Sequence, residues 1–145
     1  MTTAEVQTPA GPEARPQSHA LDLLIRIAGG VIAALASILS GVLEIFLSPL
    51  RAGGVLLGVS IVAAAVGNYA IGWFAHATVG KGSAVALPWA LWTLLMLFAA
   101  GTRTHEGDYL ISGDNWVALV MILVGSLTYA LFAYRMIVKS LPSPR

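Results

Sequence analysis

Residues 27–47 read IAGGVIAALASILSGVLEIFL, an unbroken apolar run in which Glu44 is the only charged side chain. A helix needs about 20 such residues to cross ~30 Å of hydrocarbon. The run ends at Ser48-Pro49, because proline cannot continue the hydrogen-bond ladder of a helix. This stretch therefore predicts a transmembrane helix.

Three more segments of the same kind follow, at about residues 52–74, 84–100 and 116–138. Over the whole chain, 57% of the residues are hydrophobic and only 10% are charged, against roughly a quarter charged in an average soluble domain. Four such helices in a soluble protein would have no polar face to cover them. We therefore predict an all-α fold, an integral membrane four-helix bundle with short loops over residues 20–140.

The two ends of the chain are expected to lie outside the bundle. Residues 1–19 contain three prolines and no apolar periodicity, so they cannot bury enough surface to offset the entropy of ordering. We predict a disordered tail there, an interfacial start of the first helix from residue 20, and a short second tail at residues 141–145. With four crossings, both tails lie on one side of the membrane.

Lysine and arginine indicate the orientation, because basic residues are enriched in cytoplasmic loops. The side that carries the tails and the loop near residue 80 holds six of them: Arg15, Arg26, Lys81, Arg135, Lys139 and Arg145. The opposite side holds two, Arg51 and Arg103. This asymmetry predicts cytoplasmic termini in a multi-pass protein of the plasma (inner) membrane.

Glu44 is the first candidate functional residue, since a carboxylate in an apolar segment is costly and usually functional. It lies close to Pro49, which predicts a shallow position at the outer end of the first helix. One interpretation is a carboxylate that binds a proton or cation. The other is an interfacial ion pair with Arg51 or Arg103 that fixes the helix ends.

The loop RTHEGDYLISGDN, residues 103–115, is the second candidate. Its Arg103, Glu106 and Asp108 are candidate contact residues for a partner. His105, Glu106, Asp108 and Asp114 also offer donors for a divalent cation, although the spacing of a calcium loop is absent. The alternative is a solvated turn held by arginine–carboxylate pairs.

Asn68 and a set of small residues complete the candidates. Asn68 is predicted in the inner half of the second helix, where an asparagine bonds across a helix interface or contacts a substrate. Small residues recur every four positions at Ala33, Ser37 and Gly41, and Gly54 and Gly58 form a G-x-x-x-G pattern. Such stripes allow close packing of helices in lipid, within the bundle or between subunits.

Several function classes are unsupported by the sequence. The chain has no cysteine, which excludes disulfides and thiolate chemistry, and its net charge of +1 gives no pull toward nucleic acid. No nucleophile–base arrangement or phosphate loop is present, and no histidine pair stands at matching depth for haem. We therefore expect no enzyme activity, no cofactor and no resident metal.

The stretch Arg103-Thr104-His105-Glu106-Gly107-Asp108, between the third and fourth segments, is similar to small actinobacterial integral membrane proteins of unknown function. The similarity covers residues 26–137 in layout, and its specific parts are this loop and Gly125-Ser126. It implies the four-helix topology and no mechanism. The chain also resembles the four-helix small multidrug exporters in size and in a first-helix glutamate. That resemblance implies proton coupling at Glu44, but here the glutamate is displaced outward and the third loop is longer.

Two hypotheses of function follow. The leading one is a non-enzymatic accessory or scaffold subunit, whose outer loop and small-residue helix faces contact a membrane protein partner or a second copy. The alternative is a small oligomeric proton-coupled transporter, with Glu44 and Asn68 lining the path.

Overall fold

The computed structural model describes residues 17–103, 105, 107–111 and 114–140. Within them the chain forms four α-helices, and the all-α four-helix prediction is confirmed. The helices are α1 (Gln17–Leu47), α2 (Val59–Val79), α3 (Ala86–Gly101) and α4 (Trp116–Ser140), with the short strands β1 (Arg51–Ala52) and β2 (Val55–Leu56) and the 3₁₀ helix η1 (Gly82–Val85). All four helices, α3 together with η1, are long and apolar enough to cross a membrane, as expected of a multi-pass membrane protein.

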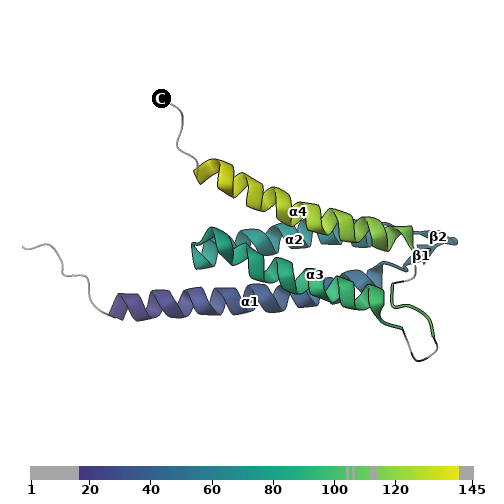
Figure 1. Cartoon of the computed structure of the whole chain (residues 1–145), viewed down its shortest axis with the longest axis horizontal. Coiled ribbons are helices and arrows are strands. Elements are labelled where there is room, and N and C mark those ends of the chain that lie inside the picture. Colours follow the sequence, from purple (N-terminus) through teal and green to yellow (C-terminus); the bar gives the residue numbers. More distant parts are fainter. Residues whose placement is uncertain (1–16, 104, 106, 112–113, 141–145) are drawn as a thin grey trace, which may run out of the picture.

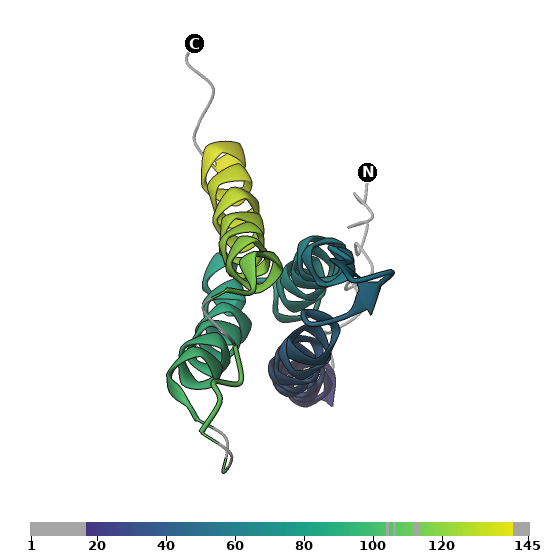
Figure 2. The same ribbon diagram turned by 90° about the vertical axis from the view of Figure 1, so that its right-hand side faces the viewer.

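The helices run up and down in turn, side by side (Figure 1). One end of the bundle, the hairpin end, carries β1, β2 and the loop after α3. The other, the basic end, carries Arg26, Lys81, Arg135 and Lys139. α1 packs against α2 and α3, and α2 packs against α4, while α3 and α4 touch only sparsely and α1 and α4 lie apart (Figure 2). α4 diverges from the other helices as it approaches the basic end (Figure 1).

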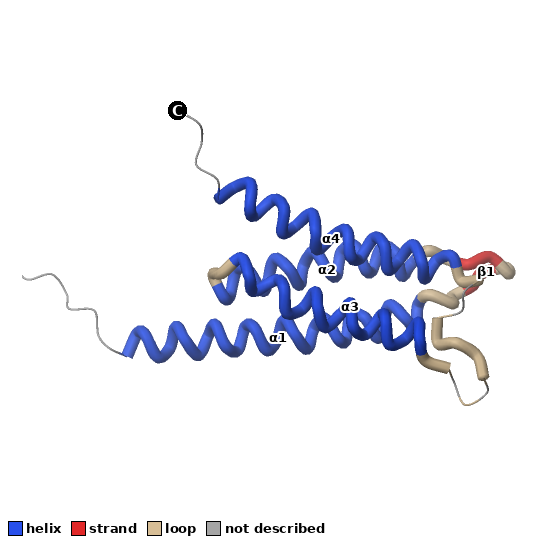
Figure 3. Tube along the Cα trace, viewed as in Figure 1, coloured by secondary structure: helices blue, strands red, loops and turns tan. Residues whose placement is uncertain are grey.

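The start of α2 differs from the prediction of about residue 52. Residues 51–56 form a two-stranded antiparallel hairpin in which Arg51 pairs with Leu56 and Ala52 with Val55 (Figure 3). The turn is Gly53-Gly54, with φ of 58° and 85°, and two consecutive positive φ angles suit the hairpin turn that matches strand twist. The apolar residues of this hairpin look helical by composition, but the glycine pair redirects the chain. The predicted Gly54–Gly58 packing stripe is therefore wrong, because both residues precede α2.

The start of α1 also differs from the prediction. Helix α1 begins at Gln17, so the last residues assigned to the disordered tail are helical, and residues 1–16 lie outside the described part. The helix has 31 residues and continues for more than two turns before Arg26. At that point Arg26 donates from Nη1 to the carbonyl of Val79 over 3.0 Å, at the end of α2. The side chains of Leu21, Leu24 and Ile25, before this contact, are each more than half exposed.

Candidate functional site

Glu44 lies inside the bundle, with no exposed surface. Its Oε2 accepts a hydrogen bond from Trp92 Nε1 of α3 over 2.9 Å, and its Oε1 accepts one from Ser40 Oγ, one turn earlier on α1, over 2.7 Å. A bond across two helices and a bond within one helix thus hold both carboxylate oxygens. We call Glu44, Ser40 and Trp92 the Glu44 site.

Glu44 lies three residues before the end of α1, as predicted, but the expectation of a shallow side chain is wrong, because its carboxylate is enclosed by the neighbouring helices. A Cβ added at Gly67 would lie 3.8 Å from Glu44 Oε1 and 2.8 Å from Ser40 Oγ. Gly67 comes eight residues after the start of α2, which is ~12 Å along the helix axis from the hairpin end. The carboxylate therefore sits well inside the apolar span. Pro49 marks where α1 ends, but it does not show how far α2 extends beyond the carboxylate.

The predicted ion pair of Glu44 is also wrong. Among the described contacts, neither Arg51 nor Arg103 pairs with this carboxylate. Arg51 lies exposed in β1. Arg103 donates from Nη2 to the Tyr109 hydroxyl over 2.7 Å, and its guanidinium carbon lies 4.6 Å from the centre of the Tyr109 ring.

Three glycines let the helices approach closely around the Glu44 site. A Cβ at Gly41 would lie 3.2 Å from Trp92 Cδ1 and 2.8 Å from Leu95, and the contact at Gly67 is as close. A Cβ at Gly125 of α4 would lie 2.5 Å from Trp92 Cη2 and 2.8 Å from Asn68 Nδ2. Such distances leave no room for a side chain. Trp92 is therefore enclosed by backbone from α1 and α4, which fixes the direction of its N–H.

Two polar groups beside the Glu44 site have no hydrogen-bond partner among the described residues. Both the amide nitrogen and the oxygen of Asn68 are buried and unpaired, and so is the hydroxyl of Tyr129. Asn68 reaches the far edge of the Trp92 indole, beside Gly125, and the Tyr129 ring centre lies 6.4 Å from that of Trp92. Buried polar groups are normally bonded, and those that are not mark a strained, functional or water-filled place.

Asn68 also differs from the sequence prediction in position and contacts. Because α2 begins at Val59 rather than near residue 52, Asn68 lies at the middle of the helix instead of in its inner half. Its sequence neighbour Tyr69 packs edge-on against Phe132, and Thr128 of α4 donates to the Val124 carbonyl. The predicted bond across the helix interface is therefore not found in the part of the chain that the structure describes.

The hairpin-end loop does not extend the Glu44 site. Asp108 and Arg103 are exposed on it, and Glu106 lies outside the described residues. Among the residues that are described, no three histidine or acidic side chains gather to hold a metal ion. The loop is tied to the bundle by Asn115, whose Nδ2 donates to Ser48 Oγ over 3.4 Å and whose Oδ1 accepts from the Ala118 N–H over 3.2 Å.

The sequence prediction missed Trp92, Ser40 and Tyr129. Ser40 could have been found, because it precedes Glu44 by four residues and so shares its helix face. Trp92 and Tyr129 carry no such signal, since an aromatic residue in an apolar helix is ordinary. The buried small residues Ala33, Ser37 and Gly41 do lie on the packed face of α1, within the bundle.

The chain was compared with protein-family models, curated proteins and solved structures, and none of them matches it. The resemblance to small actinobacterial integral membrane proteins of unknown function therefore stays a prediction. The site has to be interpreted from its own geometry.

Proposed function

We propose that this membrane protein is a small proton-coupled transporter in which Glu44 binds and releases the proton. The observation that supports the proposal is the complete burial of Glu44 between three helices, with only neutral donors in contact. A carboxylate in such a place is expensive unless it exchanges its charge, and intramembrane carboxylates are typical of proton relays. An interfacial ion pair, by contrast, needs an arginine partner, and none of the described residues provides one.

The groups around Glu44 suit a carboxylate that gains and loses a proton and a polar cargo molecule that passes beside it. Trp92 and Ser40 hold the carboxylate oxygens when the proton is absent, and either oxygen can then take it up. The unpaired amide of Asn68 and the hydroxyl of Tyr129 lie beside Trp92. They offer hydrogen bonds to water or to a polar part of a cargo molecule within the span. In this proposal the chain acts as an oligomer, since one four-helix unit has few surfaces to enclose a path.

The proton step is tested by a pH titration of Trp92 fluorescence. Trp73, Trp89 and Trp116 are replaced by phenylalanine, so that Trp92 is the only tryptophan, and its emission is recorded in lipid nanodiscs between pH 4 and 9. We expect a sigmoidal change of emission that is lost in Glu44→Gln, because the amide keeps an acceptor but binds no proton. Identical curves for the two proteins would exclude proton exchange at Glu44.

Coupling to transport is tested in vesicles that hold a pH-sensitive dye. A panel of small amines, sugars and organic cations is added outside, and proton movement is followed for each compound. A compound that moves protons with the native chain but not with Glu44→Gln supports the proposal. Proton movement of equal size with Glu44→Gln would contradict it. The matched control is Asp108→Asn, which neutralises an exposed carboxylate at the hairpin end.

An accessory or scaffold role is the second candidate, and one observation favours it. The hairpin end presents a short two-stranded sheet with an exposed apolar side chain, Val55, and the loop after α3 presents the exposed Arg103–Tyr109 pair. A partner subunit can add a strand to such an edge. A mild-detergent pull-down followed by mass spectrometry tests this role. Loss of a stoichiometric partner in the combined Arg103→Ala and Tyr109→Ala variant supports it, and recovery of the chain alone contradicts it.

The proposed orientation, with the basic end in the cytoplasm, follows the excess of basic residues at that end. Because the chain has no cysteine, single thiols report topology without background. Val55→Cys should react with an impermeant maleimide in intact cells, and Ser83→Cys should react only after lysis. The reverse pattern would invert the orientation.

A further inference from the structure

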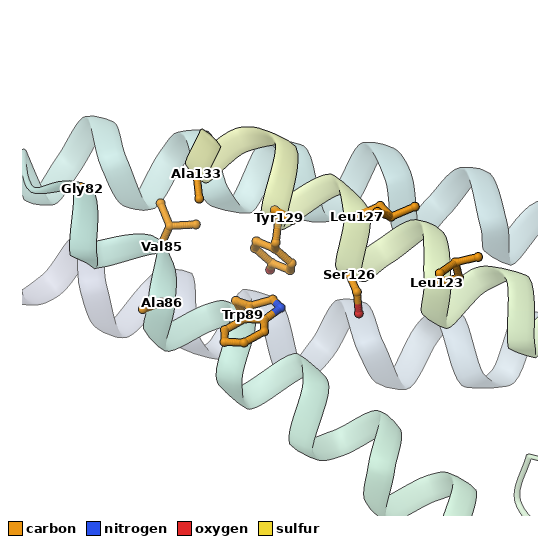
Figure 4. Close-up of a pocket in the computed structure, with 10 residues that line it drawn as sticks. Gly82, Val85, Ala86, Trp89, Leu123, Ser126, Leu127, Tyr129 and Ala133 are labelled. Atoms are coloured by element: carbon orange, nitrogen blue, oxygen red, sulfur yellow. The ribbon is translucent and has the colours of Figure 1, made fainter. Parts of the chain in front are cut away.

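A groove runs between α3 and α4, on the side of the bundle where the two helices meet least. It is a cavity of about 470 Å³, lined by Trp89 of α3 and by Leu123, Leu127 and Ala130 of α4, among others. Figure 4 shows these two helices facing each other across it, with Trp89 between them. Trp89, Leu123 and Leu127 are each about half exposed, so the groove opens outward from the bundle rather than into its core.

A second cavity, of about 720 Å³, continues the groove toward the basic end. The two cavities share Gly82 and Ala133 in their walls, so they join end to end. The second one is lined by His76, Ser83 and Lys139, which are a histidine, a hydroxyl and an ammonium group. No carboxylate lies in either lining within the described residues.

His76 adds an independent sign of a missing ligand. Its Nδ1 is buried and has no hydrogen-bond partner among the described residues, while its ring packs edge-on against Phe132. A ring nitrogen that is neither solvated nor bonded needs a partner, since buried polar groups are paired in nearly all proteins. An anionic oxygen in the second cavity is the partner that the nearby Lys139 would also attract.

We propose that these joined cavities bind one anionic phospholipid, with an acyl chain in the α3–α4 groove and the phosphate at His76, Ser83 and Lys139. The polarity of the cavity walls changes along the membrane normal in the way that a lipid requires. The walls are apolar and aromatic within the span, and they carry basic and hydroxyl groups at the basic end. Lys139 comes ten residues after Tyr129, ~15 Å along α4, which leaves the length of an acyl chain below the headgroup. Basic pockets between transmembrane helices bind anionic headgroups.

A lipid also fits better than the other occupants of such a groove. An apolar partner helix would cover the groove but bring no anion to Lys139 and His76. A free anion would use the second cavity and leave the apolar groove without a role. The volume of the groove lies within the usual range of small-molecule sites, and the acyl chains of the bilayer are the ligand present at that depth. This site does not include Glu44, Ser40 or Trp92, although Tyr129, which lies beside Trp92, also lines the groove.

Native mass spectrometry of the purified chain tests the headgroup part. The protein in detergent is mixed with phosphatidylglycerol or with phosphatidylcholine of identical acyl chains. We expect one phosphatidylglycerol to be retained, with at least fivefold tighter binding than phosphatidylcholine. Lys139→Ala should bring the two lipids to near parity, whereas Arg51→Ala, which removes a positive charge at the opposite end, should leave the preference intact. Equal retention of the two lipids by the native chain would overturn the proposal, and so would equal effects of the two alanine variants.

Filling the groove tests the acyl-chain part. Ala130→Phe and, from the facing wall, Ala86→Phe should each lower retention of both lipids severalfold. The matched control Ala100→Phe adds the same ring on an exposed part of α3 outside the groove and should change nothing. Size-exclusion profiles and circular dichroism show which variants fold, and the two groove variants replace each other if one does not. Unchanged retention in a folded groove variant would exclude the acyl chain.

Two further measurements are made. The first distinguishes a lipid phosphate from a free phosphate ion, and the second distinguishes the lipid site from the Glu44 site. Inorganic phosphate, at a hundredfold excess over the lipid, should not displace phosphatidylglycerol, and displacement would identify an anion site instead. Glu44→Gln should retain phosphatidylglycerol as the native chain does. Lipid binding and proton exchange can therefore fail independently of each other.

Discussion

The two halves of the bundle are held together in different ways. Toward the hairpin end, Glu44 links α1 to α3 through Trp92, Asn115 links α4 to the end of α1, and glycines bring the backbones close. Toward the basic end, α4 leaves α3 and an apolar groove opens between them, and a second cavity with basic and hydroxyl groups continues it between α2, η1 and α4. In lipid there is little hydrophobic force to join helices, so close packing and polar bonds decide where they stay together. The hairpin half therefore sets the geometry of α3 and α4, whereas in the basic half α1 and α2 stay joined, through Arg26 and Gly29, and only the space beside α4 is left for other molecules.

The largest expected loss of stability comes from a side chain that forces the helices of the hairpin half apart. Gly125→Val places a side chain where Trp92 and Asn68 already stand, so α4 must move away from α3. Overpacking of this kind costs roughly 1–3 kcal/mol, and we expect the upper part of that range. The loss is measured as a fall in the free energy of unfolding in SDS titrations. Gly101→Ala is the control, because a Cβ there meets nothing within 4 Å. Equal stability of the two variants would show that α4 is not tightly packed against Trp92.

Removing the carboxylate should have the next largest effect. Glu44→Leu leaves the Trp92 N–H and the Ser40 hydroxyl without their acceptor in an apolar interior, at a cost of about 1–2 kcal/mol. Glu44→Gln keeps an acceptor and should lose less than half as much in the same SDS titration. If leucine were tolerated as well as glutamine, the bond from Trp92 would not hold the hairpin half together.

Much of the fold follows from the sequence, because four long apolar runs with few charges can be satisfied only by membrane-spanning helices. The depth of Glu44 within the bundle could not be predicted from the sequence. Pro49 marks the end of α1 correctly, yet the position of Glu44 relative to α2 depends on where the Gly53-Gly54 turn places the next helix. The choice of Glu44 and Asn68 came from their polarity alone. Trp92 became visible only when the packing of three helices was known, since nothing local distinguishes it from a lipid-facing tryptophan.

A smaller effect is expected where the hairpin-end loop is tied down. Asn115→Ala removes the side-chain cap at the start of α4 and the bond to Ser48, and loss of such a cap costs about 1 kcal/mol. Asn115→Asp keeps the capping oxygen, so it should recover most of the loss in the unfolding titration. Equal losses in the two variants would assign the effect to the Ser48 bond instead of the cap.

The smallest effect is expected at the border between the halves. The Tyr129 hydroxyl has no partner among the described residues, so Tyr129→Phe should change the free energy of unfolding by less than about 0.5 kcal/mol. Trp92→Phe, which removes a bonded N–H in the same layer, is the comparison and should cost clearly more. A large loss of stability in Tyr129→Phe would reveal a hydrogen bond of the hydroxyl, through water or a ligand, that links the Glu44 site to the basic half.

The length of α1 has a consequence for how the whole molecule sits in the bilayer. Its 31 residues span ~46 Å, well beyond the ~30 Å of hydrocarbon. The surplus turns before Arg26 expose leucine and isoleucine side chains that headgroups and water disfavour. A helix with such surplus length leans over to keep its apolar turns among the acyl chains. Because α1 is packed against both α2 and α3, it cannot lean alone, and the bundle axis must incline with it.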